Sequence, residues 1–389
     1  MSNQLNSAKL EKGDSFQKIM NSYDYIIALG LSFLLSLLIV PAVIWLARKL
    51  KVIDYPDRER KVHKKPTPLL GGLAIFFVFN ALLLFYALVT KNLTGDTITL
   101  RNLFGISIGT IFLLIGGFLD DKYDLKPKWQ IIWPIGAIAS VIICGIGIDW
   151  ITNPFGQGLV YLDEYQYTLF WYHGFPYKIT LLADFFTFFW LLAMMYTTKL
   201  LDGLDGLVSG MAVIGGVFVF LTSLNKGEIV QYDVALLAII IVGIFAGFLV
   251  FNFHPASIFF GEGGSTMAGF LLGALSIVSG SKVGVTLMLM SIPVLDVLWT
   301  IARRMIGKKS PFLSADRQHL HHRLLEAGFS VKRAVLFFYS MAVIFGIIAY
   351  YLQEINMALL LIAIVALIIF LLILAYLFRR KKLNGMGLT

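Results

Sequence analysis

Residues 179–207 read ITLLADFFTFFWLLAMMYTTKLLDGLDGL, a long apolar run that ends in two Asp-Gly pairs. The apolar part is long enough for a helix to cross the hydrocarbon core of a membrane. Asp202 and Asp205 therefore stand where a membrane-spanning segment meets water. Carboxylates at this spacing would share one helix face and repel each other, and a carboxylate inside a membrane is costly. The stretch predicts a cation nearby, either a metal ion or a Lys or Arg side chain; a polar, Gly-containing helix end is the simpler alternative.

The composition of the whole chain agrees with a membrane protein. Of the 389 residues, 58% are hydrophobic and only 14% are charged, whereas soluble domains carry about 25% charged residues. The single cysteine, Cys144, lies in an apolar run, which excludes a disulfide framework and a Cys-rich metal site. The net charge of +9 requires no nucleic acid as partner, because basic loops on the inner side of a membrane account for it.

Apolar runs of spanning length predict an all-α polytopic membrane protein with about eleven transmembrane helices. The runs lie at 24–47, 69–90, 102–119, 130–149, 179–198, 207–224, 234–252, 265–281, 283–302, 334–352 and 356–378. The predicted organisation is a polar N-terminal tail at 1–23, one transmembrane domain at 24–378 and a basic C-terminal tail at 379–389.

Basic residues are distributed unequally between the two sets of loops that alternate along the chain. One set holds 24 of the 32 Lys and Arg residues and the other holds eight. Because cytoplasmic loops are enriched in Lys and Arg, the first set is cytoplasmic, with the N-terminus outside and the C-terminus inside. The polar motifs described below all fall on the cytoplasmic side, whereas the external loop 150–178 is rich in aromatic residues suited to the membrane interface. We therefore expect an active site in a cytoplasm-facing cleft.

Two acidic stretches besides the Asp-Gly pairs are candidate metal sites. Asp120 and Asp121 end the third predicted span, and Lys122 follows them. Carboxylate oxygens together with substrate phosphates are ligands that Mg²⁺ prefers, and a lysine can meet a phosphate. Glu262 stands among three glycines of the run 261–264, which predicts a loop whose backbone N–H groups face an anion. A solvated charged loop and an ordinary turn are the respective alternatives.

Basic residues form two further clusters. Residues 319–323 read His-Leu-His-His-Arg, and no Glu stands where a zinc hydrolase motif needs it, so phosphate recognition is favoured over zinc. Residues 58–72 carry several basic side chains and His63, which suits anionic lipid headgroups and also a plain cytoplasmic loop. Asp296 lies inside the ninth predicted span and is either functional or paired with a basic residue. Carboxylates for Mg²⁺ and basic groups for phosphate predict phosphoryl transfer from a nucleotide-type donor to a membrane lipid.

At these residues the chain resembles the polyprenyl-phosphate N-acetylhexosamine-1-phosphate transferases, over about residues 52–323. The motifs occur in order: Arg-Lys-x-His with Pro-x-x-Gly-Gly, Asp-Asp, Asp-Gly-x-Asp-Gly-Leu, Asn-x-x-Pro-Ala with Gly-x-x-Gly-Ser, and His-x-His-His-Arg. The last motif is similar to the WecA/TagO branch and unlike the His-His-His-Phe-Glu motif of the MraY branch.

The resemblance implies transfer of a HexNAc-1-phosphate from a UDP-sugar to polyprenyl (undecaprenyl) phosphate with release of UMP. GlcNAc-1-phosphate is the favoured group among the HexNAc-1-phosphates. It implies Mg²⁺ as cofactor, with Mn²⁺ as the alternative, and a multi-pass protein of the bacterial plasma membrane acting at the first membrane step of envelope glycan synthesis. A homodimer is compatible with the sequence, which does not fix the oligomeric state. By resemblance the catalytic residues are Asp120, Asp121, Asp202 and Asp205, the metal ligands are Asp120, Asp121, Asp205 and Glu262, and the substrate-binding residues are His63, Lys122, Lys199, Asn252, His319, His321, His322 and Arg323.

Three positions depart from the family pattern. The family usually has Asn where Lys199 stands, Asp where Glu262 stands and often Arg where Leu69 stands. The alternatives to the predicted function are an MraY-like transfer of a peptide-bearing muramyl phosphate, a cation-coupled transporter and a non-catalytic scaffold. Transport is disfavoured because the polar residues crowd one side of the membrane instead of the midplane.

Overall fold

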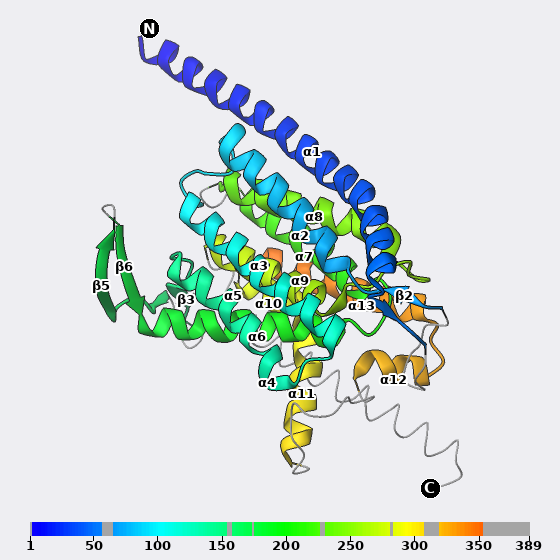
Figure 1. The fold of residues 1–389 in the computed structure, drawn as a ribbon. Helices are drawn as coiled ribbons and strands as arrows, with labels where there is room; N and C mark the ends of the chain where they lie inside the picture. Colours follow the sequence, from blue (N-terminus) through cyan, green and yellow to red (C-terminus); the bar gives the residue numbers. More distant parts are fainter. Residues whose placement is uncertain are drawn as a thin grey trace, which may run out of the picture.

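The computed structural model describes residues 2–56, 65–153, 158–172, 175–225, 230–280, 283–306 and 319–352. Most of these residues are helical (Figure 1). The helices are α1 (Ser2–Leu50), α2 (Gly71–Leu84), which continues as the π-helix η1 (Phe85–Val89), α3 (Leu100–Tyr123), α4 (Pro127–Gln130), α5 (Ile132–Ile143), α6 (Leu181–Leu201), α7 (Leu207–Ser223), α8 (Tyr232–Asn252), α9 (Gly261–Val278), α10 (Val283–Leu289), α11 (Ser291–Ile306), α12 (Leu320–Glu326) and α13 (Val331–Leu352).

The helices agree with the predicted spans as far as the chain is described. Each of the first ten apolar runs coincides with a helix or with an interrupted helix. By length and composition, six described helices can cross a membrane, or seven if α10 and α11, which are bent by 74° at Met290, form one span. The protein is thus a predominantly helical, multi-pass membrane protein. The total of eleven spans and the orientation stay predictions, and the run 356–378 and the C-terminal tail lie outside the described residues.

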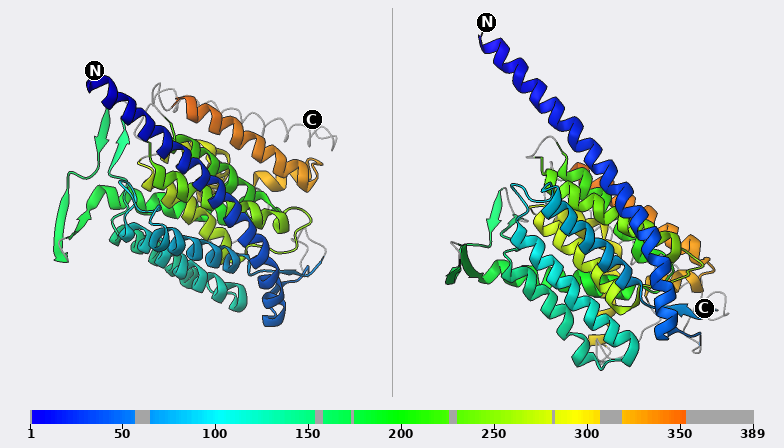
Figure 2. Two further views of the ribbon diagram at one scale, coloured as in Figure 1. Left: turned by 90° about the horizontal axis from the view of Figure 1, so that it is seen from above. Right: turned by 45° about the horizontal axis from the view of Figure 1, so that its top comes forward.

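The N-terminal segment and one loop differ from the expected organisation. Helix α1 begins at Ser2, so the residues expected to form a separate polar tail continue the helix of the first span. It packs along α8, and its N-terminal part projects beyond the bundle (Figure 2).

The fold is also not all-α, because the described residues include six short strands in three antiparallel pairs. Strands β1 (Ile53–Asp54) and β2 (Thr67–Pro68) pair near the start of α2, and the other two pairs, β3 (Trp150–Thr152) with β4 (Leu159–Tyr161) and β5 (Gln166–Tyr172) with β6 (Phe175–Thr180), occupy the loop before α6. Aromatic and β-branched residues favour strands, which explains why this aromatic loop becomes a pair of hairpins.

Helix α9 lies at the centre of the bundle, and glycines let its neighbours approach closely. A Cβ added to Gly117 of α3 would lie 2.1 Å from the Cα of Gly263, and one added to Gly72 of α2 would lie 2.7 Å from the Cα of Gly264. Small residues allow such backbone contacts between membrane helices. The C-terminal end of α3 and the first turn of α9 are therefore fixed against each other.

This packing predicts that Gly117→Ala destabilises the protein. The added methyl group would overlap the backbone of α9, and overpacking of this kind costs about 1–3 kcal/mol. We expect a lower thermal melting temperature of the purified protein in detergent. Gly30→Ala in α1 is the matched control, because nothing lies within 4 Å of the position of its added Cβ. Equal melting temperatures for Gly117→Ala and Gly30→Ala would contradict the packing argument.

Candidate active site

Asp202 and Asp205 lie in the turn between α6 and α7. Helix α6 ends at Leu201, Asp202 is its C-cap residue, and α7 begins at Leu207. Gly206 has a φ of 83°, a left-handed conformation that glycine adopts readily. The spacing alone suggested that the two carboxylates share one face of a helix. In the structure they lie instead in a tight turn between two helices.

The side chain of Asn252, at the end of α8, holds this turn. Its Oδ1 accepts hydrogen bonds from the backbone N–H of Gly206 at 3.2 Å and from the hydroxyl of Ser209 at 2.9 Å. Its Nδ2 donates to the carbonyl of Ile258 at 3.0 Å. Asn252 is buried, and both ends of its amide serve the protein itself, so it orients the acidic turn; its predicted contact with a substrate stays a prediction.

His254 is a further residue of this region that the sequence did not single out. Its Nδ1 lies 2.6 Å from Oδ2 of Asp205, and the same oxygen accepts a hydrogen bond from the backbone N–H of Ala256 at 3.1 Å. Its signal in the sequence was weak, because it occupies a variable position of the Asn-x-x-Pro-Ala motif. The segment after α8 thus fixes the orientation of Asp205.

Asp120 and Asp121 end α3 and have different partners. Oδ1 of Asp120 accepts hydrogen bonds from the N–H of Leu125 at 2.8 Å and from Nε2 of Gln130 at 3.0 Å. Oδ1 of Asp121 accepts from the N–H of Glu262 at 2.9 Å. The predicted glycine-rich loop is instead the first turn of α9, and this backbone N–H group faces a carboxylate of the protein.

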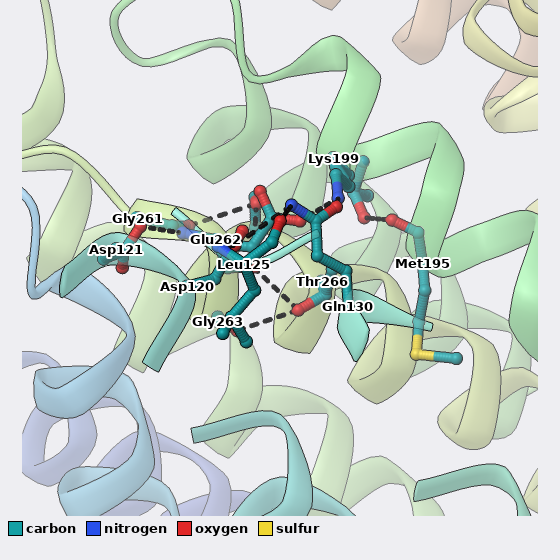
Figure 3. A network of polar contacts seen from close by, with 12 residues as sticks. Asp120, Asp121, Leu125, Gln130, Met195, Lys199, Gly261, Glu262, Gly263 and Thr266 are labelled. Atoms are coloured by element: carbon teal, nitrogen blue, oxygen red, sulfur yellow. Dashed lines mark hydrogen bonds and ion pairs between the residues drawn. The ribbon is translucent and has the colours of Figure 1, made fainter. Parts of the chain in front are cut away.

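Lys199 and Glu262 form an ion pair between α6 and α9 (Figure 3). The ammonium also donates to Oε1 of Gln130 at 3.4 Å. Gln130, in α4, thereby connects Lys199 to Asp120, and nothing in its sequence context distinguished it. Lys199 thus lies in the same region as the Asp-Gly pairs, and the ion pair it makes is with Glu262.

A cavity of about 390 Å³ unites most of the predicted site. The carboxylates of Asp121, Asp202, Asp205 and Glu262 line it together with Lys199, Asn252 and His322. Burial, followed by the neighbouring carboxylates of Glu262 and Asp205, raises the pKa of Asp202 to about 8. Asp120, His319 and His321 lie outside its lining. His63 lies outside the described residues.

The donor set of this cavity fits Mg²⁺ in kind. Carboxylate oxygens are ligands that Mg²⁺ prefers, and the crowding that raises the pKa of Asp202 is relieved when a divalent cation joins the carboxylates. Within the described ranges, no three His, Cys, Asp or Glu side chains converge closely enough to hold an ion as they stand. The described carboxylates are of the kind that binds Mg²⁺, but they do not converge on one point.

The histidine motif packs against the acidic turn from α12. Nδ1 of His319 lies 2.9 Å from Oδ2 of Asp296, and the N–H of Leu320 donates to Oδ1 of Asp296 at 2.9 Å. The buried ring of His321 stacks parallel to that of His319 with centroids 5.7 Å apart. A Cβ added to Gly203 would lie 2.4 Å from Nε2 of His321, so the glycine makes room for this ring.

Two further predicted substrate-binding residues, Lys122 and Arg323, do not line the cavity. The ammonium of Lys122 lies 5.6 Å from the centroid of the Phe118 ring and 5.4 Å from that of Tyr123, at an exposed position outside the cavity lining. Arg323 follows His322 in α12 and is half-buried. Asp296 is paired with a histidine, as one of its two interpretations expected.

The chain is similar in sequence to several known transferases. The pattern of glycosyl transferase family 4 matches residues 103–280. The chain is 32% identical to a probable undecaprenyl-phosphate N-acetylglucosaminyl 1-phosphate transferase of Bacillus subtilis, over 90% of this chain and 91% of that protein. It is 30% identical to a decaprenyl-phosphate N-acetylglucosaminephosphotransferase of Mycolicibacterium smegmatis, over 78% and 75%. It is also 30% identical to a phospho-N-acetylmuramoyl-pentapeptide-transferase of Geobacillus thermodenitrificans, over 84% and 97%.

These relatives, together with the multi-pass helical bundle and its cavity of acidic side chains, identify a membrane-embedded transferase. The similarity to the Bacillus subtilis protein covers nearly the whole of both chains, and this extent shows the family. The chain belongs to glycosyl transferase family 4, among the polyprenyl-phosphate N-acetylhexosamine-1-phosphate transferases that its motifs indicated.

The burial of His321 predicts a pH-dependent stability. Burial, with the imidazoles of His322 and His319 nearby, lowers the pKa of His321 to about 3. Because the folded state disfavours the protonated ring, this stabilisation is full above the unfolded pKa of about 6.5 and is lost as the pH falls toward 3, by up to about 1.4 kcal/mol per pH unit. We expect the melting temperature of the wild type to fall more steeply than that of His321→Gln between pH 7 and pH 5. Parallel profiles for the two proteins would contradict this assignment.

Proposed function

We propose that the protein transfers GlcNAc-1-phosphate from UDP-GlcNAc to undecaprenyl phosphate, forming the lipid diphosphate sugar and releasing UMP. The observation that carries this proposal is the cavity lined, among the described residues, by five acidic side chains (Asp54 is the fifth), one lysine and one histidine at the ends of membrane helices. Phosphoryl transfer depends mainly on positioning and on neutralisation of charge, and this set of side chains supplies both. The relatives named for the same transfer support the choice of donor and acceptor.

The cavity residues have distinct roles in this proposal. Asp121, Asp205 and Glu262 would hold Mg²⁺, or Mn²⁺ in its place, with Asp120 close behind Asp121. The bound ion supplies charge neutralisation between the donor and acceptor phosphates. In the site without an ion, burial raises the pKa of Asp202 to about 8, so its carboxyl group can hold a proton at neutral pH. His322 lines the same cavity and can donate to a phosphate oxygen.

A second cavity supports a lipid acceptor. Its volume is about 250 Å³, and it lies among α2, α3 and α9, where its lining is apolar apart from Asp121. Asp121 and Leu69 line both cavities. A lipid phosphate has to present its head to the polar cavity while its chain stays in apolar surroundings. We assign the apolar cavity to the part of the isoprenoid chain next to the phosphate.

The proposed enzyme acts in the bacterial plasma membrane with its site facing the cytoplasm, where UDP-sugars are available. The bias of basic residues toward that side supports this orientation. A peptide-bearing muramyl donor is the second candidate, because one relative named for that transfer is 30% identical. The His-x-His-His-Arg motif at 319–323 favours the simpler GlcNAc donor.

The test uses purified protein in detergent with undecaprenyl phosphate, Mg²⁺ and radiolabelled UDP-GlcNAc. We expect labelled lipid and UMP in equal amounts, with a loss of about a hundredfold or more in Asp121→Asn because its charge is removed from the cavity. Asp124→Asn is the matched control: this exposed residue has a φ of 50°, and asparagine tolerates this conformation.

Two further outcomes of the assay are informative. Turnover with another UDP-HexNAc and none with UDP-GlcNAc would keep the reaction and correct the sugar. No turnover with any nucleotide sugar, in protein that melts cooperatively, would overturn the proposed function in favour of a non-catalytic scaffold.

The apolar cavity yields a separate prediction about the acceptor. Ile115→Trp places a larger side chain in its lining. We expect a higher KM for undecaprenyl phosphate and an unchanged KM for UDP-GlcNAc. Ile111→Trp, one turn away on α3 at an equally exposed position outside the lining, should leave both values as they are. Equal effects of the two substitutions would contradict the assignment of this cavity.

A further inference from the structure

The polar cavity contains an internal cation. Among its described lining residues, Lys199 is the one Lys or Arg, and it shares the lining with five acidic residues: Asp54, Asp121, Asp202, Asp205 and Glu262. Its ammonium contacts Oε1 of Glu262, with the two side chains 21% and 25% exposed. This ion pair is therefore largely shielded from water but still reachable from the cavity.

Neighbouring groups hold Lys199 in this position. The ammonium donates to Oε1 of Gln130 at 3.4 Å, and Nε2 of Gln130 donates to Asp120 at 3.0 Å. The ring of Tyr196, one turn earlier on α6, lies with its centroid 5.5 Å from the ammonium. Figure 3 shows this chain of contacts running from the end of α3 through α4 to α9.

Lys199 and a divalent ion make competing demands on Glu262. The oxygen that contacts the ammonium is one that a metal would need, and an ammonium and a divalent cation repel each other at the same carboxylate. The lysine is a point charge on a flexible four-carbon stem, so it can leave the carboxylate without moving the backbone.

We propose that Lys199 is a built-in counter-cation that occupies Glu262 while no divalent ion is bound and competes with that ion for it. The proposal rests on the proposed function, because it assumes that Glu262 serves a metal. Binding of the ion displaces the ammonium, which remains in the same cavity and can neutralise an entering phosphate. Lys199 thereby sets the concentration of divalent cation at which the site fills.

Titration of Mn²⁺ into substrate-free protein tests the competition directly. The free ion is measured by its electron paramagnetic resonance signal in detergent solution, with wild type, Lys199→Asn and Lys128→Asn. We expect Lys199→Asn to bind Mn²⁺ about fivefold more tightly, the factor that corresponds to about 1 kcal/mol for one ion pair. Lys128→Asn is the matched control, because it removes one exposed positive charge from α4 and leaves the ion pair intact.

A double-mutant cycle isolates the pair from the general charge of the site. In a Glu262→Gln background the ammonium has no carboxylate to release, so adding Lys199→Asn should change Mn²⁺ affinity no more than Lys128→Asn does. Melting profiles of all variants show that each is folded. An effect of Lys199→Asn that is equally large in both backgrounds would overturn the proposal.

Other results also decide against it. Unchanged or weaker Mn²⁺ binding in Lys199→Asn would mean that the lysine does not compete, and that it holds Glu262 in place instead. Turnover that needs Mg²⁺, in a wild type that binds no Mn²⁺ without substrate, would overturn this proposal and leave the proposed function standing. Tighter Mn²⁺ binding in Lys199→Asn without turnover of any UDP-sugar would support the competition and overturn the proposed function alone.

Discussion

The contact between the backbones of α3 and α9 is the constraint on which the site depends. Gly117 and Gly263 bring the two helices so close that no side chain fits between them. As a result, the first N–H groups of α9 reach the end of α3, where that of Glu262 binds the carboxylate of Asp121. A helix start that would otherwise need water or a cap is satisfied by an acidic residue of the site. The close contact of the two helix backbones and the hydrogen bond to Asp121 therefore occur at the same place.

The other contacts of the site are mostly made by groups that neutralise or orient its acidic side chains. Among the described residues, five acidic side chains line one cavity, and their partners include the ammonium of Lys199, backbone N–H groups and His254 beside Asp205. These partners orient the acidic side chains. Burial, followed by the neighbouring carboxylates of Glu262 and Asp205, raises the pKa of Asp202. In the proposed reaction, a divalent ion would have to draw these carboxylates together.

Much of the fold could be predicted from the sequence because the longer helices coincide with apolar runs of spanning length. The acidic pairs were found for a similar reason, since a carboxylate at the end of such a run is costly and therefore informative. Contacts between distant segments left no such local signal. Gln130 is a single amide at the start of an apolar run, and only the folded chain shows that it joins Asp120 to Lys199. The hairpins before α6 were missed because their aromatic residues also suit a membrane interface.

The bond between Asp296 and His319 has a consequence for the biosynthesis of the protein. It ties the bent helix α11 to the segment that carries His321 and His322, and this segment packs against the acidic turn at Gly203. During translation, Asp120 and the acidic turn emerge long before residues 319–322 do. A nascent chain inserted up to α11 therefore carries its acidic residues without the histidine segment that completes the site. A truncated product that ends before residue 319 would therefore span the membrane without the contacts that His319 and His321 make with α11 and the acidic turn.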